Sequence, residues 1–329
     1  MQIHLAAWWH TGNGPNSGAV NIHQRQLAEM RYPYHLESFH YMDRGILNQA
    51  NAAGVKWFLD SGAFSALTQG IKIDIKKYGQ FVLEAQKRGM LSVASNLDDT
   101  SKNELLTYQN QKYLEAMGCV VQPVFHTREN EEWLAKYLDE GYDYIFIGGM
   151  VPETTKWLHG WLDHIWYHYL TNPDGTPRVK VHGFGLTSLP LMFKYPWYSV
   201  DSTSWQATGS FGSIFVDVPQ PNGLIRDYKV DFSSVSQKRY DMNSWHFGSL
   251  TGPERATILE RLDVLEAARP KFPALEDNIA KIMGCPQGFN PEALAKSYGW
   301  RWYANAEYFR RAMDRRIDRF TRKQDTLWD

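Results

Sequence analysis

Residues 57–63 read WFLDSGA, an apolar run followed at once by an aspartate, a serine and a glycine. Similar short runs, rich in β-branched or aromatic residues, alternate along the chain with segments of helical spacing. Such alternation is typical of repeated βα units rather than of a β-sandwich. We predict eight strands, at residues 3–9, 57–63, 92–98, 120–126, 144–149, 180–186, 198–202 and 213–218. Eight strands suggest an α/β fold, a TIM-type (β/α)8 barrel with a helical C-terminal extension.

The segments of helical spacing lie between these strands and after them. Several end at glycine, a common helix stop. We expect helices at residues 73–89, 102–117, 129–140, 153–170, 252–268 and 303–323. The last of these places apolar residues on one face and arginines on the other, and the pair Asn222-Gly223 before them is a strong turn signal. The expected organisation is one domain, with the barrel at about 1–232 and the helical extension at about 233–329.

The composition is that of a folded globular protein, because 43% of the residues are hydrophobic and 14% are aromatic. Cys119 and Cys285 are the two cysteines, too few for a disulfide framework or a cysteine-based zinc site. We interpret them as reduced thiols. No run of 18 apolar residues and no secretory signal is present, so we expect a cytoplasmic protein without a membrane partner.

The net charge of −1 gives no overall attraction to a polyanion. Residues 301–323 differ, with eight basic residues against three acidic ones. This local excess could contact a phosphate backbone, and a solvated helix face is the alternative. The candidate nucleic-acid contacts are Arg310, Arg311, Arg315, Arg316 and Arg319.

Polar residues stand at the ends of six consecutive predicted strands. Catalytic side chains of TIM-type barrels come from the carboxyl ends of the strands. An aspartate after a strand is by itself commonly a turn or helix-cap residue. Six strand ends together indicate a pocket instead, formed by Asp60, Asp98 with Asp99, His126, Gly148 with Gly149, His182 and Asp201.

The residues at these strand ends resemble the motifs of the tRNA-guanine transglycosylase superfamily. The run LDSGAF at 59–64 is similar to the family's D-S-G-G-[FY]-Q signature. The further matches keep the family's order and spacing over about residues 55–205: SNLDD at 95–99, VQPVFH at 121–126, IGG at 147–149, HGFG at 182–185 and VDST at 200–203. The forms LDSGAFS and VDSTSW are closest to the phage branch, which inserts 7-deazaguanine bases into DNA.

The resemblance implies a covalent mechanism with two carboxylates. Asp201 would be the nucleophile that attacks C1′ of the target nucleoside and forms a glycosyl-aspartate. Asp60 would be the general acid and base, which protonates the departing guanine and deprotonates the incoming base. Two carboxylates with separate roles are what a retaining double displacement requires. Asp60 must therefore exchange protons while Asp201 stays ionised.

The resemblance also implies the residues that read the base. Asp98 or Asp99 would accept hydrogen bonds from the guanine N1–H and 2-amino group. Backbone N–H groups near Gly148, Gly149 and Met150 would approach O6 or a 7-substituent. Ser61 lies in the signature, and Phe64 would stack on the purine. His126 and His182 stand where the family has a glutamine for base recognition and often a methionine that closes the other purine face.

The zinc motif of the tRNA enzymes is absent, so neither a metal nor a cofactor is implied. We therefore expect DNA as the partner, with its guanine flipped out or single-stranded, in a host cytoplasm if the protein is viral. The arginines above and the loop HTGNGPNSG at 10–18 would contact phosphates. A zinc-free tRNA enzyme is one alternative. A non-catalytic nucleic-acid-binding barrel is another, and a metal-dependent barrel hydrolase using His10, His126 and His182 is a third.

Overall fold

The structure of the chain is a computed structural model. It describes residues 1–6, 31–41, 54, 56–99, 103–151, 153–186, 188–237, 245–315 and 317–321. These residues fall into two compact units. The first unit contains the described residues of 1–6, 33–202 and 313–321. The second contains Arg31, Tyr32 and the described residues of 203–312.

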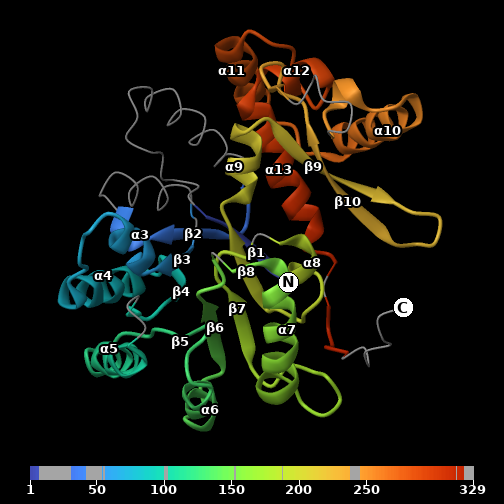
Figure 1. The fold of residues 1–329 in the computed structure, drawn as a ribbon. Helices are drawn as coiled ribbons and strands as arrows, with labels where there is room; N and C mark the ends of the chain where they lie inside the picture. The colour runs from blue at the N-terminus through green and yellow to red at the C-terminus, as the bar shows by residue number, and fades with distance from the viewer. Residues whose placement is uncertain are drawn as a thin grey trace. The chain divides into compact units, whose positions relative to one another are not determined.

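The first unit is built on a curled sheet of eight parallel strands (Figure 1). Its spatial order is β4-β3-β2-β1-β8-β7-β6-β5. The strands are β1 (Gln2–Ala6), β2 (His35–Ser38), β3 (Trp57–Asp60), β4 (Leu91–Ala94), β5 (Val124–His126), β6 (Tyr144–Gly148), β7 (Lys180–Gly183) and β8 (Ser199–Ser202). The α/β class expected from the sequence is thus confirmed, with a parallel sheet and helices between its strands.

No strand ladder joins β4 to β5 at the two edges of this sheet within the described residues. One parallel bridge lies just beyond them, between Ser95 and Gln122. Two backbone hydrogen bonds of 2.9 Å support it, from Asn96 N to Gln122 O and from Gln122 N to Ala94 O. This narrow contact, called the seam below, links the segments that follow β4 and precede β5, and the strand ladders of the described residues do not close the sheet into a barrel.

The sequence analysis assigned one strand to the wrong sheet and missed another strand. Residues 213–218 belong to β9 (Ser213–Pro219), which pairs antiparallel with β10 (Ile225–Asp231) in the second unit instead of forming the eighth parallel strand. The missing parallel strand is β2, whose sequence HLES contains one aliphatic residue. Its first three residues are nevertheless buried. Short apolar runs look alike in both sheet types, and a strand as polar as β2 carries no periodic signal.

Helices lie on the outer side of the curled sheet (Figure 1). Asp74 caps α4 and Asn103 caps α5, where each side chain accepts backbone N–H groups of the first turn. Helix α7 continues into a π-helical segment, Trp166–Leu170. The bounds are α3 (Ala63–Thr68), α4 (Ile75–Lys87), α5 (Glu104–Ala116), α6 (Glu132–Asp139), α7 (Thr155–Ile165) and α8 (Leu189–Met192). The four helices expected between 73 and 170 are confirmed with shorter bounds.

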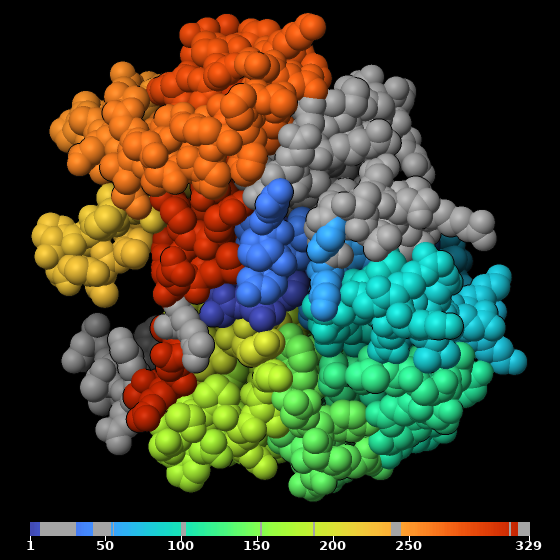
Figure 2. Space-filling view, turned by 180° about the vertical axis from the view of Figure 1, so that it is seen from behind, coloured from blue at the N-terminus to red at the C-terminus, as the bar shows by residue number. Residues whose placement is uncertain are grey.

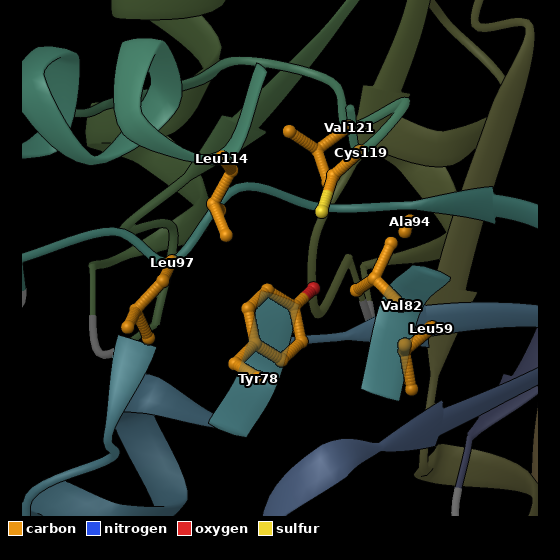
Figure 3. Packing of buried hydrophobic residues seen from close by; sticks show 8 residues of the cluster. All are labelled: Leu59, Tyr78, Val82, Ala94, Leu97, Leu114, Cys119 and Val121. Atoms are coloured by element: carbon orange, nitrogen blue, oxygen red, sulfur yellow. The ribbon is translucent and has the colours of Figure 1, made fainter. Parts of the chain in front are cut away.

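Two apolar layers hold this unit together. The outer layer lies between the sheet and helices α4 and α5, which lie side by side (Figure 2). The ring of Tyr78 lies among Leu59, Ala94 and Leu114 in that layer (Figure 3). The inner layer fills the curl of the sheet with Ala6, Leu36, Phe58, Val124, Tyr144 and Phe146. The interior is therefore a packed core, and ligands are left with the ends of the strands.

The second unit combines the β9–β10 hairpin with helices. These are α9 (Ser204–Ser210), α10 (Gly252–Ala268), α11 (Pro273–Met283), α12 (Pro291–Lys296) and α13 (Tyr298–Ala312). Asn305 fixes α13 to its neighbours, because its side chain accepts from Phe215 N and donates to Trp205 O, both at 2.9 Å. The expected helix 252–268 is confirmed with the same bounds.

The expected helix 303–323 was wrong at both ends, because α13 begins earlier and ends at Ala312. The residues that follow belong to the first unit. There Phe320 is buried and stacks on Tyr195, with ring centroids 5.6 Å apart, and its N–H donates to Gly175 O at 2.8 Å. Burial of this ring and its backbone bond favour irregular chain over the helix that the apolar spacing predicted.

In the described ranges, no helix combines the length and apolarity needed to cross a lipid bilayer.

Candidate active site

The carboxyl ends of the parallel strands gather the candidate residues in the first unit. Asp60, His126 and Gly148 are the last residues of β3, β5 and β6. Asp201 lies one residue before the end of β8. Because parallel strands present their ends at one edge of the sheet, these side chains share one mouth. The mutual electrostatic effects of Asp60, Asp98 and Asp201 agree with this placement.

Asp201 is held by two hydrogen-bond donors on one oxygen. Its Oδ1 accepts the backbone N–H of Gly185 at 2.8 Å and the Nε2–H of His182 at 3.2 Å. The side chain is only 9% exposed. Among the described residues no donor reaches Oδ2 of Asp201. One oxygen is therefore fixed and the other is left for a ligand at the mouth.

His182 lies beneath Asp201 and is fully buried. Its Nδ1 lies 2.6 Å from the Ser199 hydroxyl, which in turn lies 2.5 Å from the Tyr144 hydroxyl. Burial lowers the pKa of His182 even though the neighbouring Asp201 acts in the opposite direction. The ring is thus neutral near pH 7. The ring has no exposed surface in this structure, and the role in closing the purine face that the resemblance implied stays a prediction.

The acidity of Asp60 is strongly altered. Burial, followed by the negative charges of Asp98 and Asp201, raises its pKa from 3.8 to about 7. The N–H of Gly62 donates to its Oδ2 at 3.1 Å and opposes this effect. A carboxyl group with such a pKa holds a proton about half of the time near neutral pH. It can therefore serve as both proton donor and proton acceptor.

Asp98 is tied to a charged imidazole. Its Oδ2 lies 2.9 Å from Nε2 of His126, whose Nδ1 lies 2.9 Å from Oε1 of Glu129. Burial alone would lower the pKa of His126, but these two carboxylates outweigh it and raise the pKa to about 10. Burial alone would likewise raise the pKa of Asp98, yet His126 holds it below 3.8. Asp98 is thus an ionised acceptor, and both nitrogens of His126 are engaged by protein carboxylates.

The neighbouring Asp99 makes hydrogen bonds to the start of α5. Its N–H donates to Thr107 Oγ1 at 2.9 Å, and its Oδ2 accepts the N–H of Asn103 at 3.2 Å. These are contacts with the start of α5. The sequence left Asp98 and Asp99 as alternatives for base reading, and it is Asp98 that interacts with Ser61 and His126.

Ser61 and Phe64 follow β3 in different environments. Ser61 is fully buried, receives no solvent, and donates its hydroxyl to Asp98 Oδ1 at 3.2 Å. It therefore supports Asp98 rather than facing a ligand. Phe64, on the short helix α3, is 60% exposed. Its ring is free of the apolar core and available for stacking.

The glycines after β6 allow close packing. A Cβ on Gly148 would come within 2.7 Å of the His126 ring, so glycine is needed for His126 to lie there. Gly149 has a φ of 71°, in the left-handed region that favours glycine, and its carbonyl accepts from Thr127 Oγ1 at 2.7 Å. Met150 is buried. Gly148 thus makes room for a side chain of the protein.

The candidate arginines make contacts within the protein. Arg310 lies 3.3 Å from Glu307, and Arg311 donates to Asp217 at 3.0 Å. Arg315 lies over the ring of Phe193 at 5.0 Å from its centroid. Arg319 is exposed. Because α13 ends at Ala312, the single arginine-lined helix face expected from the sequence does not form. Arg316, His10 and the loop at 10–18 lie outside the described residues.

Three residues of the site escaped the sequence reasoning: Tyr144, Ser199 and Glu129. Ser199 stands two residues before Asp201, so strand alternation puts both on the same face of β8. Glu129 stands three residues after His126 in a turn. These spacings were the available signals in the sequence. Neither spacing identifies a site residue until the neighbouring strands are aligned and the contacts are known.

A cavity of about 700 Å³ lies at the opposite, amino ends of the strands. Gln2, Lys180 and Tyr198 are among its lining residues. Gln2 and Lys180 begin β1 and β7, so this cavity is separated from Asp201 by the length of the strands. In a parallel αβ fold the chemistry belongs to the other end, and we place the candidate site there.

Among the residues that the structure describes, no group of three or more His, Cys, Asp or Glu side chains has an arrangement suited to a metal ion. No protein-family model matches the sequence, and no curated protein matches it either. The residues at the mouth are therefore the basis for a functional proposal.

Proposed function

We propose that this chain is a DNA-guanine transglycosylase on a TIM-type (β/α)8 barrel. It would exchange guanine in DNA for a 7-deazaguanine base through a covalent intermediate. The observation that carries the proposal is the contrast between two carboxyl groups at one mouth. Asp60 has a pKa of about 7, whereas Asp201 has one oxygen fixed by two N–H donors and the other without a donor among the described residues.

This contrast supports a double displacement. In the first half, Asp201 Oδ2 forms a bond to C1′ as the bond from C1′ to guanine breaks, and Asp60 gives its proton to the departing base. In the second half, Asp60 takes the proton from the ring nitrogen of the incoming 7-deazaguanine. That nitrogen bonds to C1′, and the Asp201 carboxylate is released. The proton on Asp60 is thus used and restored in one turnover.

The environment of Asp98 supports selection for guanine. Ser61 and His126 each use one lone pair of its carboxylate. A carboxylate has further acceptor sites, which can face the N1–H and 2-amino group of guanine. Adenine lacks both donors in those positions. Since both ring nitrogens of His126 are engaged, we assign to it the role of fixing and ionising Asp98 in place of direct contact with the base.

The test is direct. Purified protein is incubated with guanine-containing DNA, or separately with tRNA, together with 7-cyano-7-deazaguanine, and the nuclease-digested nucleosides are analysed by mass. We expect the 7-deazaguanine deoxynucleoside in the DNA digest and none with Asp201→Asn. Modification of tRNA alone would assign the same chemistry to the other polymer. If neither polymer is modified, the proposal is wrong.

A further inference from the structure

Four side chains form a continuous hydrogen-bonded line beneath the mouth: Asp201, His182, Ser199 and Tyr144. The successive distances are 3.2, 2.6 and 2.5 Å. They come from three adjacent strands of the sheet, β8, β7 and β6. None of the four is more than 9% exposed. A polar line this deeply buried is costly unless each member has its partner.

The chemistry of the groups fixes the direction of every hydrogen bond in the line. The proposed mechanism requires Asp201 as a carboxylate, which can only accept, so Nε2 of His182 carries the proton. Because burial keeps His182 neutral, its Nδ1 is then a lone pair and must accept from the Ser199 hydroxyl. The oxygen of Ser199 is left to accept from the Tyr144 hydroxyl. Tyr144 stays protonated as well, since burial raises its pKa beyond the usual value.

The rest of the surroundings of His182 supports this arrangement. Its ring packs against Phe58 at 4.3 Å and Phe184 at 4.8 Å between centroids. The titratable groups that face it are Asp201 from β8 and His4 from β1, whose ring centroid lies 5.9 Å away. Burial lowers the pKa of His4 strongly, so His4 adds no positive charge. The Ser199 hydroxyl is therefore the hydrogen-bond partner of Nδ1 of His182.

We propose that Ser199 and Tyr144 are positioning residues for the nucleophile: they hold His182 in the tautomer whose Nε2–H fixes Oδ1 of Asp201. This inference rests on the proposed function and deepens it. With Oδ1 engaged by His182 and Gly185, Oδ2 is the oxygen left to attack C1′. A hydroxyl below the site thus sets the angle of attack, without touching the substrate.

Two measurements test the proposal on the full chain. The first is the nitrogen NMR spectrum of protein labelled with ¹⁵N-histidine, which reports the tautomer without any substrate. We expect His182 to be protonated at Nε2 and bare at Nδ1. In Ser199→Ala the Nδ1 resonance should shift because its donor is lost. A wild-type protein that carries the proton on Nδ1 would overturn the proposal.

The second measurement is the single-turnover rate of covalent protein–DNA complex formation, together with the affinity for a guanine-containing oligonucleotide. Misplacement of a reacting group costs up to about 100-fold in rate. We expect Ser199→Ala to lower the rate about 10- to 100-fold at unchanged DNA affinity, and Tyr144→Phe to lower it about 3- to 10-fold. Ser199→Thr keeps the hydroxyl and should restore most of the rate.

Tyr195→Phe is the matched control, because Tyr195 is another buried tyrosine of this unit that donates to a carboxylate, Asp163, at 2.8 Å. Its loss should leave both the His182 spectrum and the rate unchanged. Wild-type rates in Ser199→Ala would refute the positioning role. If wild-type protein forms no covalent complex, the proposed function fails, whereas the spectra still decide the tautomer that Ser199 imposes.

Discussion

The raised pKa of Asp60 suits proton transfer but lowers the stability of the fold. A carboxyl group whose pKa is raised in the folded state costs stability wherever it is ionised. For Asp60 this cost in stability is absent below pH 3.8, grows as the pH rises, and is complete above about pH 7. A pKa shift of one unit corresponds to about 1.4 kcal/mol. Because Asp60 is partly exposed, solvent screening reduces the full cost of its shift to a value on the order of 3 kcal/mol.

We therefore expect Asp60→Asn to raise the free energy of unfolding by on the order of 3 kcal/mol at pH 8 and to change it little at pH 4. Urea unfolding across this range measures the difference. Asp74→Asn is the matched control, because Asp74 is an exposed helix cap and asparagine caps equally well. Equal stability of Asp60→Asn and wild type at pH 8 would show that Asp60 is not ionised at a cost.

At the scale of elements, the turn after β3 connects packing to the site. Gly62 has a φ of 78°, and an added Cβ would lie 2.6 Å from the Cβ of His40. Its N–H donates to Asp60 Oδ2 at 3.1 Å. The conformation that brings the chain from β3 into α3 also orients the proposed acid and base. A side chain at this position would disturb both.

Gly62→Ala should lose about 2–4 kcal/mol of stability, because backbone strain and a close contact act together. Gly70→Ala separates the two effects, since Gly70 has a φ of 67° but nothing within 4 Å of an added Cβ. The control should lose only about 1 kcal/mol. Denaturant midpoints of the two variants give the comparison, and equal losses would mean that the contact with His40 is relieved without cost.

Much of the element pattern was predictable from the sequence because β3 and β6 are continuous apolar runs that end in polar or glycine residues. β2 was not, since Glu37 is buried in a strand that looks like a loop. The carboxylates Asp60 and Asp201 were predicted through their motifs. The partners of His126 and His182 were not, because a buried ion pair or a serine below a histidine becomes visible only when neighbouring strands are aligned.

At the scale of the whole molecule, the net charge of −1 hides how the basic residues are used. Arg311 shares Asp217 with Arg261, whose guanidinium donates at 2.9 Å. These are contacts of the second unit with itself, as is the pair of Arg310 with Glu307. Arginines committed in this way stabilise the fold and have less to offer a phosphate.

Arg311→Ala should thus lower the melting temperature, by the equivalent of about 1–2 kcal/mol, since Arg261 still compensates Asp217. Arg319→Ala, at an exposed position, should leave the melting temperature unchanged. If Arg319 contacts a phosphate, that variant should reduce the salt dependence of DNA binding by about one ion. Thermal melts and binding titrations at several salt concentrations separate the two roles. A stable Arg311→Ala protein with weaker DNA binding would reverse the assignment.

The seam between β4 and β5 ties recognition to local unfolding. Two backbone hydrogen bonds at Gln122 hold it, and the ion pair of His126 with Asp98 fastens it again at the mouth. The edge with so few bonds is where the sheet can open first, so its amides should exchange with solvent ahead of those in β1 and β8. A base that binds Asp98 would then slow that amide exchange, because binding would reduce local opening of the sheet at the seam.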